Sequence, residues 1–198
     1  MLNEIIKLRE EAKLNGEPIL RDKSFEILLK TVKDKQPLSI LEIGVNLGLS
    51  GIAMLLESKQ ATLSGIEIDE AKILLARENY KKFGVDKRAK IFLGDAGEII
   101  PILTGKYDFI FLDGPKGHYF EYLPNLISVL NKGGILFADN VLFRGYVDGK
   151  VKTPHRFNTT KNSMERFLQS ITSDKNLKTQ IIDIEDGISI TEKTLWKN

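Results

Sequence analysis

Residues 38–44 read Leu-Ser-Ile-Leu-Glu-Ile-Gly, an apolar run that ends in glycine. Such a run is typical of a strand buried on both faces of a parallel sheet, and the glycine marks the turn after it. Alternation of strands and helices at short spacing predicts βαβ units and a parallel sheet. Similar apolar runs follow at 61–68, 89–93, 107–112 and 134–138, and helical patterns lie between them at 50–58, 70–83, 96–103 and 120–130.

The two ends of the chain depart from this alternation. Apolar residues at helical spacing predict an amphipathic helix close to the start and a second helix over 23–33. Two further strands are expected at 180–184 and 188–191, on either side of Glu185-Asp186-Gly187. An Asp-Gly turn of this kind joins hairpin strands, so the last strand should run antiparallel to its neighbour. The least regular stretch is 143–158, where we expect a loop.

Length and composition favour one globular domain. A chain of 198 residues can bury a sizeable core but is short for two ordinary domains. We therefore predict an α/β, single-domain, Rossmann-like fold with a mostly parallel seven-stranded sheet and an antiparallel last strand. In this prediction residues 1–35 supply N-terminal helices, and residues 36–198 form the α/β core.

Charge and residue content exclude several classes of protein. The 29 basic and 27 acidic side chains leave a net charge of +2, which gives no whole-chain signal for nucleic-acid binding. The absence of cysteine excludes disulfides, thiolate metal sites and a cysteine nucleophile. The charged opening stretch lacks the apolar core of a signal peptide, and no apolar run is long enough to span a bilayer. We expect a cytoplasmic protein.

The loop after the first strand is a candidate ligand site, because open parallel sheets bind ligands outside the carboxyl ends of their strands. It runs from Glu42 through Gly44 and Gly48 to Ser50, which opens the next helix, and its glycines allow a close approach to a ligand. Alone, such a loop fits a methyl donor, a dinucleotide or a plain tight turn. The dinucleotide spacing G-x-G-x-x-G is missing, because its second glycine is replaced by Asn46, and this favours a nucleoside without a pyrophosphate.

Acidic residues end the next two strands. Glu67 closes the second strand, where a carboxylate can accept hydrogen bonds from both hydroxyls of a ribose. An acid in this region can instead favour a helix N-terminus, a role that suits Asp69 and Glu70 better than Glu67. Asp95 follows the third strand and can accept from an adenine amino group, or it can cap the helix that follows.

The fourth and fifth strands end in further oxygen donors. Asp113 follows the fourth strand, and Asp139 and Asn140 end the fifth. If these strands are neighbours, all three side chains reach the same edge of the sheet. Three hard oxygen ligands suit Mg²⁺, Ca²⁺ or Mn²⁺ rather than zinc. Any one of them could be a capping residue, but three that converge beside a nucleoside pocket favour a metal site.

As an ordered set, these motifs resemble those of the cation-dependent O-methyltransferases, the family of catechol and caffeoyl-coenzyme A O-methyltransferases and their small bacterial relatives. The resemblance runs in one register from residue 18 to the C-terminus, and implies a class I methyltransferase fold, S-adenosylmethionine as the donor and a divalent cation such as Mg²⁺. The matching stretches are Leu-Glu-Ile-Gly (41–44) with Gly48 and Ser50, Ile-Glu-Ile-Asp (66–69), Gly-Asp-Ala (94–96), Leu-Asp-Gly-Pro-Lys (112–116) and Ala-Asp-Asn-Val (138–141).

The resemblance also implies roles for single residues. Those implied to line the S-adenosylmethionine pocket are Leu20, Glu42, Gly44, Ser50, Glu67, Asp95, Ala96 and Asp113. Those implied to bind the metal are Asp113, Asp139 and Asn140. Lys116 falls where the catechol enzymes carry a catalytic lysine. Pro115 departs from the family, which commonly has an acidic or small residue there, and this puts one donor contact in question.

The chemistry that these roles imply is transfer of a methyl group to oxygen. A hydroxyl is a poor nucleophile until it loses its proton, and a divalent ion that chelates two vicinal oxygens lowers the pKa of the hydroxyl and fixes its position. Lys116 could act as the base only if its pKa lay below the usual value of about 10.4. The alternative is a solvated lysine at the start of a helix.

The segment 144–166 bears on the identity of the acceptor. A basic rim with interleaved aromatic residues suits a polyanion whose target base is turned out and stacked, although a solvated loop can have the same composition. Within the family the chain most resembles the bacterial tRNA 5-hydroxyuridine methyltransferases, which form 5-methoxyuridine. The shared features are a short chain, Pro-Ile-Leu at 18–20, Asn-Val-Leu-Phe-Arg-Gly at 140–145 and a basic segment that leads into a helix. The 5-hydroxyuridine base offers a vicinal oxygen pair, its 5-hydroxyl and 4-carbonyl. The basic residues are Arg144, Lys150, Lys152, Arg156, Lys161 and Arg166, the acids are Asp148 and Glu165, and the aromatic residues include Tyr146 and Phe157.

Three functions therefore stand at the level of sequence. The first is a tRNA-modifying O-methyltransferase, and the second is a catechol-type enzyme that acts on a small molecule. The third is a nucleoside-binding sensor without catalysis, against which the intact set of Asp113, Lys116, Asp139 and Asn140 speaks. The family resemblance also suggests a homodimer.

Overall fold

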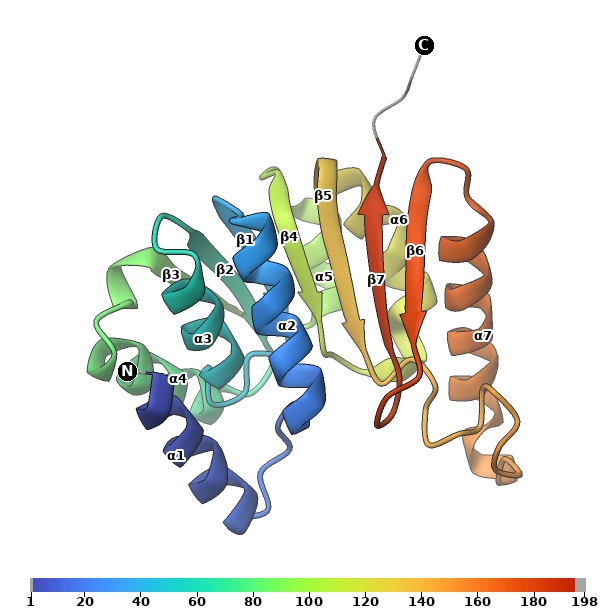
Figure 1. Ribbon diagram of the computed structural model, residues 1–198, viewed down its shortest axis with the longest axis horizontal. Coiled ribbons are helices and arrows are strands. Elements are labelled where there is room, and N and C mark those ends of the chain that lie inside the picture. The colour runs from blue at the N-terminus through green and yellow to red at the C-terminus, as the bar shows by residue number, and fades with distance from the viewer. Residues whose placement is uncertain (1, 195–198) are drawn as a thin grey trace. The chain divides into compact units, whose positions relative to one another are not determined.

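The computed structural model describes residues 2–194 (Figure 1). Its chain divides into two compact units, Met1–Asp95 and Ala96–Asn198. Each unit combines strands with helices and carries its own part of the predicted site. Among the described residues, no helix is long and apolar enough to cross a membrane.

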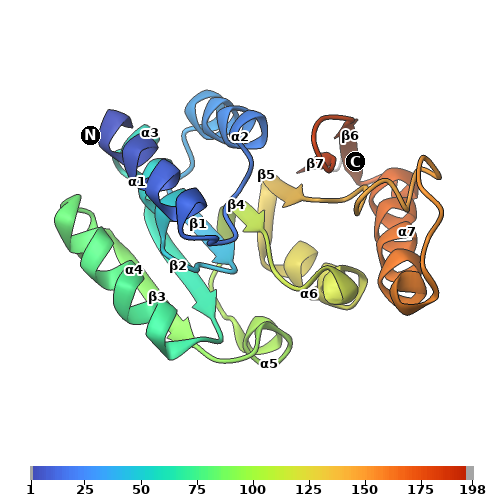
Figure 2. The ribbon, with the colours of Figure 1, turned by 90° about the horizontal axis from the view of Figure 1, so that it is seen from below.

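The first unit is a parallel three-stranded sheet with helices on one side. Its strands lie in the order β3-β2-β1, and both pairings are parallel. Figure 2 shows α1–α4 on the same side of these strands. The elements are α1 (Leu2–Leu14), α2 (Asp22–Lys35), β1 (Ser39–Ile43), α3 (Leu49–Glu57), β2 (Thr62–Glu67), α4 (Glu70–Lys82), the 3₁₀ helix Asp86–Arg88 and β3 (Ala89–Leu93).

Register places the carboxyl ends of the three strands at one edge. Glu42 pairs with Gly65, and Glu67 pairs with Leu93, so the glycine loop and Glu67 end neighbouring strands. Helix α3 packs closely on this sheet because Gly51 has no side chain. A Cβ atom there would lie 2.5 Å from both Glu42 Oε2 and the Tyr80 hydroxyl.

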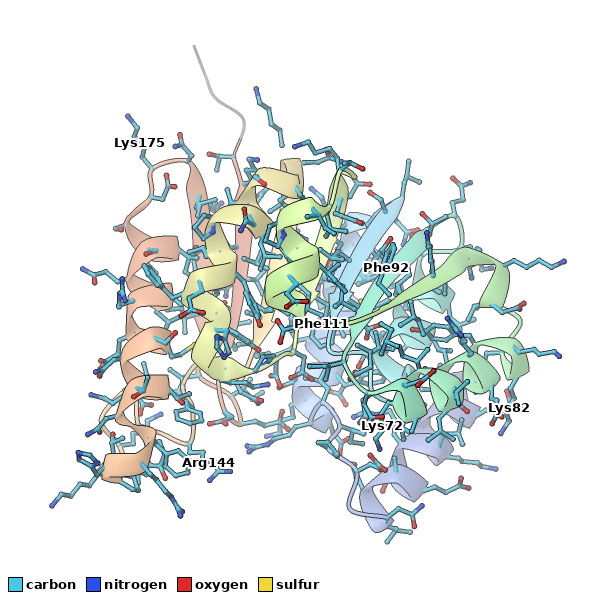
Figure 3. The ribbon with its side chains drawn as sticks, turned by 180° about the vertical axis from the view of Figure 1, so that it is seen from behind. Lys72, Lys82, Phe92, Phe111, Arg144 and Lys175 are labelled. Carbon is cyan, nitrogen blue, oxygen red and sulfur yellow. The ribbon has the colours of Figure 1, made fainter. Side chains whose placement is uncertain are left out.

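The second unit is a mixed four-stranded sheet in the order β4-β5-β7-β6. β4 and β5 are parallel, and β7 is antiparallel to both of its neighbours. Figure 3, seen from behind, shows α5 and α6 in front of these strands. The elements are α5 (Ala96–Ile99), the 3₁₀ helix Ile100–Ile102, β4 (Tyr107–Leu112), the 3₁₀ helix Lys116–His118, α6 (Tyr119–Val129), β5 (Leu130–Asp139), the 3₁₀ helix His155–Phe157, α7 (Asn158–Ser173), β6 (Leu177–Ile182) and β7 (Ile188–Lys193).

The predicted fold class is confirmed. The protein has an α/β, Rossmann-like fold with a seven-stranded mixed sheet that is mostly parallel and has antiparallel pairing at its end. The prediction of a single domain over residues 1–198 stays a prediction. Helix α7 had no predicted bounds, although the loop before it was expected.

Some element bounds differ from those predicted. The segment 96–103 was predicted as one helix, but it is a single α-helical turn followed by a 3₁₀ turn, because Pro101 lacks an N–H and disfavours α-helix in the residue before it. The sixth strand was predicted at 180–184 but lies at Leu177–Ile182. Residues 183–187 form the turn instead, in which the Gly187 N–H donates to the Ile184 carbonyl.

Candidate active site

The loop after β1 is held open by left-handed backbone. Gly44, Asn46 and Gly48 have φ angles of 88°, 47° and 75°. Gly48 is the N-cap of α3, and a Cβ there would lie 2.7 Å from a ring carbon of Tyr80. The helix therefore begins at Leu49, one residue before the predicted Ser50, and the loop has no side chain at positions 44 and 48.

Glu67 is oriented by three backbone donors. The Asn46 N–H donates to its Oε2 at 2.8 Å, and the N–H groups of Ile68 and Asp69 lie 2.9 and 3.1 Å from its Oε1. A carboxylate has about four lone-pair sites, so one acceptor site remains, on Oε2, for a ribose hydroxyl. Asp69 caps α4 by accepting from Ala71 and Lys72, which confirms that the helix-end role belongs to Asp69.

The linker between α1 and α2 is tied to this loop. The Asn46 side-chain amide donates to the Pro18 carbonyl at 2.7 Å, and Arg9 donates to the Leu20 carbonyl at 2.7 Å. Glu17 forms an ion pair of 2.6 Å with Lys72 of α4. Leu20, predicted to reach the donor pocket, has a buried side chain. Asn46 thus connects the glycine loop, the end of β2 and the linker.

Glu42 lies beneath the loop rather than on its surface. Its side chain is fully buried, and the Tyr80 hydroxyl lies 3.4 Å from its Oε2. Burial, with the Glu42 charge, raises the pKa of Tyr80 well above its ordinary value. Asp95 is exposed and directly precedes α5, whose first residue, Ala96, is buried. The structure therefore places Asp95 and Ala96, both predicted to line the donor pocket, just after the carboxyl end of β3.

The predicted metal ligands of the second unit lie at the ends of two paired strands. Leu112 pairs with Ala138, so Asp113 and Asp139 end neighbouring parallel strands, and Asn140 follows directly. The buried hydroxyl of Tyr119 lies 3.0 Å from the Leu112 carbonyl and 3.3 Å from the Asp139 carbonyl. This hydroxyl can donate to either strand end and so holds the two together.

Negative charge is concentrated at these strand ends. Asp139 is 3% exposed, and its burial raises the pKa of this carboxyl to about 7, with the Asp113 charge acting in the same direction. Lys116 opposes this effect, and its Nζ lies 2.6 Å from Asp113 Oδ1. The site therefore contains buried carboxylate charge that an added cation would stabilise.

The donor set fits a hard divalent cation. Two carboxylates and one amide oxygen are ligands that Mg²⁺ and Mn²⁺ favour, and the side chains come from the neighbouring ends of β4 and β5. In residues 2–194 no group of three or more His, Cys, Asp or Glu side chains is arranged to hold a metal. The predicted set contains only two carboxylates, because its third member is Asn140.

An aromatic cluster follows Asn140. Phe143, Tyr146 and Phe157 pack together, with ring centroids 5.5–5.7 Å apart. The guanidinium groups of Arg144 and Arg156 lie 5.4 and 4.8 Å from the centroid of Phe157. We call these five residues the cationic–aromatic cluster. Figure 3 labels Arg144, which lies on the loop near the start of α7.

Sequence reasoning missed three residues that organise the site. Asn46 was noted only as the residue that breaks a dinucleotide spacing, and Tyr119 was not singled out. Asp186 was treated only as part of a hairpin turn, yet it is 8% exposed and accepts a hydrogen bond from the Arg144 N–H. Tyr119 follows Lys116 by three residues at a helix start, but a side-chain contact to two strand ends leaves no periodic signal in a sequence.

Known proteins resemble this chain over nearly its whole length. A family model described as O-methyltransferase matches residues 2–194. The tapetum-specific methyltransferase 1 of Arabidopsis thaliana is 27% identical over 186 residues, which cover 91% of this chain and 78% of the relative. The caffeoyl-CoA O-methyltransferase of Stellaria longipes is 26% identical and covers 97% of this chain and 83% of its own.

Solved structures agree with these sequence relatives. A Staphylococcus aureus protein, provisionally assigned as a caffeoyl-CoA O-methyltransferase, superposes with a TM-score of 0.86 at 25% identity and covers 96% of this chain and 91% of its own. A methyltransferase of Podospora anserina, solved with bound SAH, has a TM-score of 0.78 at 26% identity, and covers 91% and 80% of the two chains. The chain belongs to the O-methyltransferase family and is an S-adenosylmethionine-dependent O-methyltransferase.

Proposed function

We propose that this O-methyltransferase transfers the methyl group of S-adenosylmethionine to one of two vicinal oxygens on a small aromatic acceptor, with the help of a divalent cation. The observation that carries the proposal is the grouping of Asp113, Asp139 and Asn140 at the ends of two paired strands. There Asp139 is buried, and its pKa is raised. Buried carboxyl groups whose pKa values are strongly shifted are typical of cation and catalytic sites.

The first unit supplies the proposed donor contacts. Glu67 retains one acceptor site for a ribose hydroxyl after its three backbone hydrogen bonds. The left-handed loop from Gly44 to Gly48 allows the donor to approach the backbone closely. We include Leu20, Glu42, Ser50 and Asp95 in this proposal on family resemblance, together with Ala96, which directly follows the first unit.

The second unit supplies the proposed acceptor contacts. Asp113, Asp139 and Asn140 would hold Mg²⁺ or Mn²⁺. When bound, such an ion lowers the pKa of an acceptor hydroxyl and orients its vicinal partner. Lys116 contributes a positive charge 2.6 Å from Asp113. We propose that the same Nζ atom lies close to the acceptor hydroxyl, where its positive charge stabilises the oxyanion that remains when the hydroxyl releases its proton to solvent.

The acceptor class rests on the cationic–aromatic cluster and on the relatives. Aromatic rings of Phe143, Tyr146 and Phe157 can pack on a flat acceptor, while Arg144 and Arg156 suit an anionic group attached to it. Relatives named caffeoyl-CoA O-methyltransferases are consistent with such an acceptor. We therefore favour a vicinal dihydroxyphenyl compound with an anionic tail.

A tRNA acceptor is the second candidate, favoured by the surplus of basic residues over 144–166. Lys150 and Lys161 pair with the two acids of the segment itself, Asp148 and Glu165. Lys150 also pairs with Asp183, outside the segment, and this acid lowers the surplus by one further charge. The positive charge left for a polyanion is smaller than the sequence count indicates. This difference favours the small acceptor.

The test is an acceptor assay with the purified full chain. Donor, Mg²⁺ and either caffeoyl-CoA, a free catechol or tRNA containing 5-hydroxyuridine are supplied in parallel, and methylated products are measured by mass spectrometry. We expect methylation of the dihydroxyphenyl compounds, loss of activity with excess EDTA, and recovery with Mg²⁺ or Mn²⁺. Full activity in EDTA would refute the metal site, and methylation of the tRNA alone would reverse the order of the two candidates.

A further inference from the structure

The turn between β6 and β7 is docked against the exit of β5, where two of the proposed metal ligands lie (Figure 1). Asp139 pairs with Ile188 in the antiparallel register. The Val141 N–H donates to the Gly187 carbonyl at 3.0 Å, and the Leu142 N–H donates to the Asp186 carbonyl at 2.9 Å. Asn140 is therefore bracketed on both sides by contacts to this turn.

The Asp186 side chain extends this docking to the next residues. Its carboxylate, 8% exposed, accepts a hydrogen bond from the Arg144 N–H, 42 residues earlier in the chain. Phe143 and Arg144 have φ angles of 44° and 61°, which are uncommon for residues other than glycine. Positive φ angles at such residues are kept only where contacts with the surrounding structure impose them. The Asp186 acceptor is one contact that does so.

Close packing leaves the turn little freedom to move away. Gly187 has a φ angle of +79°, and a Cβ atom there would lie 2.8 Å from Leu142 Cδ1 and closer still to Cγ. Asn140 itself has a φ angle of 56°. Because an asparagine side chain is short, the direction of its amide oxygen follows the backbone. The backbone path of residues 140–144, and with it the Asn140 ligand, depends on the turn.

We propose that Asp186 is a positioning residue for the metal site, which holds Asn140 in a ligating direction by fixing the backbone of residues 141–144. This inference rests on the proposed function, because it takes Asn140 as a metal ligand. Asp186 does not touch the acceptor or the donor in this proposal. It acts through the backbone that carries Asn140. In metal sites, residues that contact the metal ligands commonly orient those ligands in this way.

The experiment measures Mn²⁺ binding to the metal-free full chain by electron paramagnetic resonance, with S-adenosylmethionine binding measured separately by calorimetry. Asp186→Ala removes the acceptor for the Arg144 N–H, and we expect Mn²⁺ binding to weaken roughly 10- to 100-fold. Asp186→Asn keeps a carbonyl oxygen at the same place, so it should stay within a few-fold of the wild type. Donor affinity should not change in either variant.

Gly187→Ala tests the docking of the same turn while Asp186 is kept. It replaces Asp186→Ala as the test if that variant fails to fold. We expect it to weaken Mn²⁺ binding because its Cβ would push the turn away from Leu142. Gly84→Ala is the matched control, since Gly84 also has a positive φ of +66° but nothing within 4 Å of its Cβ position. Its Mn²⁺ affinity should equal that of the wild type.

The outcomes separate the two proposals. If the wild type binds Mn²⁺ and Asp186→Ala or Gly187→Ala binds it equally well, the positioning role is wrong while the metal site stands. Asp186→Asn as weak as Asp186→Ala would also overturn it, because the hydrogen bond would then be irrelevant. A wild type that binds no Mn²⁺ would refute the metal site and the positioning role together.

Discussion

The donor-binding region of the first unit and the metal-binding region of the second differ in how their carboxylates are satisfied. Glu67 receives three backbone hydrogen bonds and needs no ligand to orient it. Asp139 is buried near the like charge of Asp113, and this raises its pKa. The first region is complete as a protein structure, whereas the second has a surplus of negative charge. The comparison teaches that a binding site can be built from hydrogen bonds that are already made, or from charge that a ligand must neutralise.

Asp139→Ala should give the largest effect on function. Removal of a ligand from a site with two carboxylates should abolish methyl transfer and Mn²⁺ binding, while donor binding stays within a few-fold of the wild type. Activity assays and separate calorimetry of metal and donor measure this. Asp183→Ala is a control, because Asp183 is an exposed acid of the same unit that pairs with Lys150. Donor affinity that fell together with metal affinity would remove the distinction between the two regions.

Glu67→Ala should produce the converse result. Loss of hydrogen bonds to a charged group costs about 1.5–3 kcal/mol, so donor affinity should fall about 10- to 150-fold. Mn²⁺ binding should be unchanged, since Glu67 belongs to the other unit. Calorimetry with S-adenosylmethionine measures the change, and the exposed Glu70 offers the control Glu70→Ala. An unchanged donor affinity would sink the assignment of Glu67 to the ribose.

Replacement of Arg144, Lys152 and Arg156 by Ala should have a smaller effect that depends on the acceptor. Exposed charge pairs contribute about 0.2–1 kcal/mol each, so KM for an acceptor with an anionic tail should rise several-fold to tens-fold. A free catechol should be affected little. If tRNA is the acceptor instead, its binding should depend less on salt. The magnitude of the slope of log K against log salt should fall by about 0.7–0.9 for each phosphate contact removed. Equal losses on charged and uncharged acceptors would show that these residues act through the fold.

Asp139→Asn should stabilise the metal-free protein by a modest amount. Burial raises the pKa of Asp139 to about 7, so its charged form destabilises the fold above that pH, and the penalty fades as pH falls from about 7 toward about 4. The variant should therefore melt higher than the wild type at pH 8, by about 2–4 °C for each kcal/mol relieved, and the gap should narrow at pH 4.5. Calorimetry in EDTA measures both. A gap that widened at acid pH would contradict the assigned cause.

Much of the fold could be predicted because strand and helix periodicity is local. The apolar runs at 38–44 and 107–112 have the composition of buried parallel strands, and both became strands. The sixth strand was placed too late, because Leu177–Ile182 is largely exposed and carries little apolar signal. Pro101 was the one residue in this segment that indicated a short helix after β3.

The candidate site could be predicted only where its residues end strands. Glu67, Asp113 and Asp139 follow apolar runs, and the rule for parallel sheets groups such positions. Asp186 follows no such rule, because its contact to Arg144 depends on how a hairpin packs against a distant loop. Asn46 is similar, since its side chain reaches back to Pro18. Contacts of this kind follow from tertiary packing and have no signature in composition or spacing.

The contact between Asp186 and Arg144 also has a consequence during synthesis of the chain. Asp186 is made 42 residues after Arg144, which takes roughly 2–8 s at a translation rate of about 5–20 residues per second. During that interval Asp139 and Asn140 have been synthesised, but the turn that contacts the residues beside them has not. The chain should therefore reach its full affinity for a divalent cation late, after its glycine loop and Glu67 have long been synthesised.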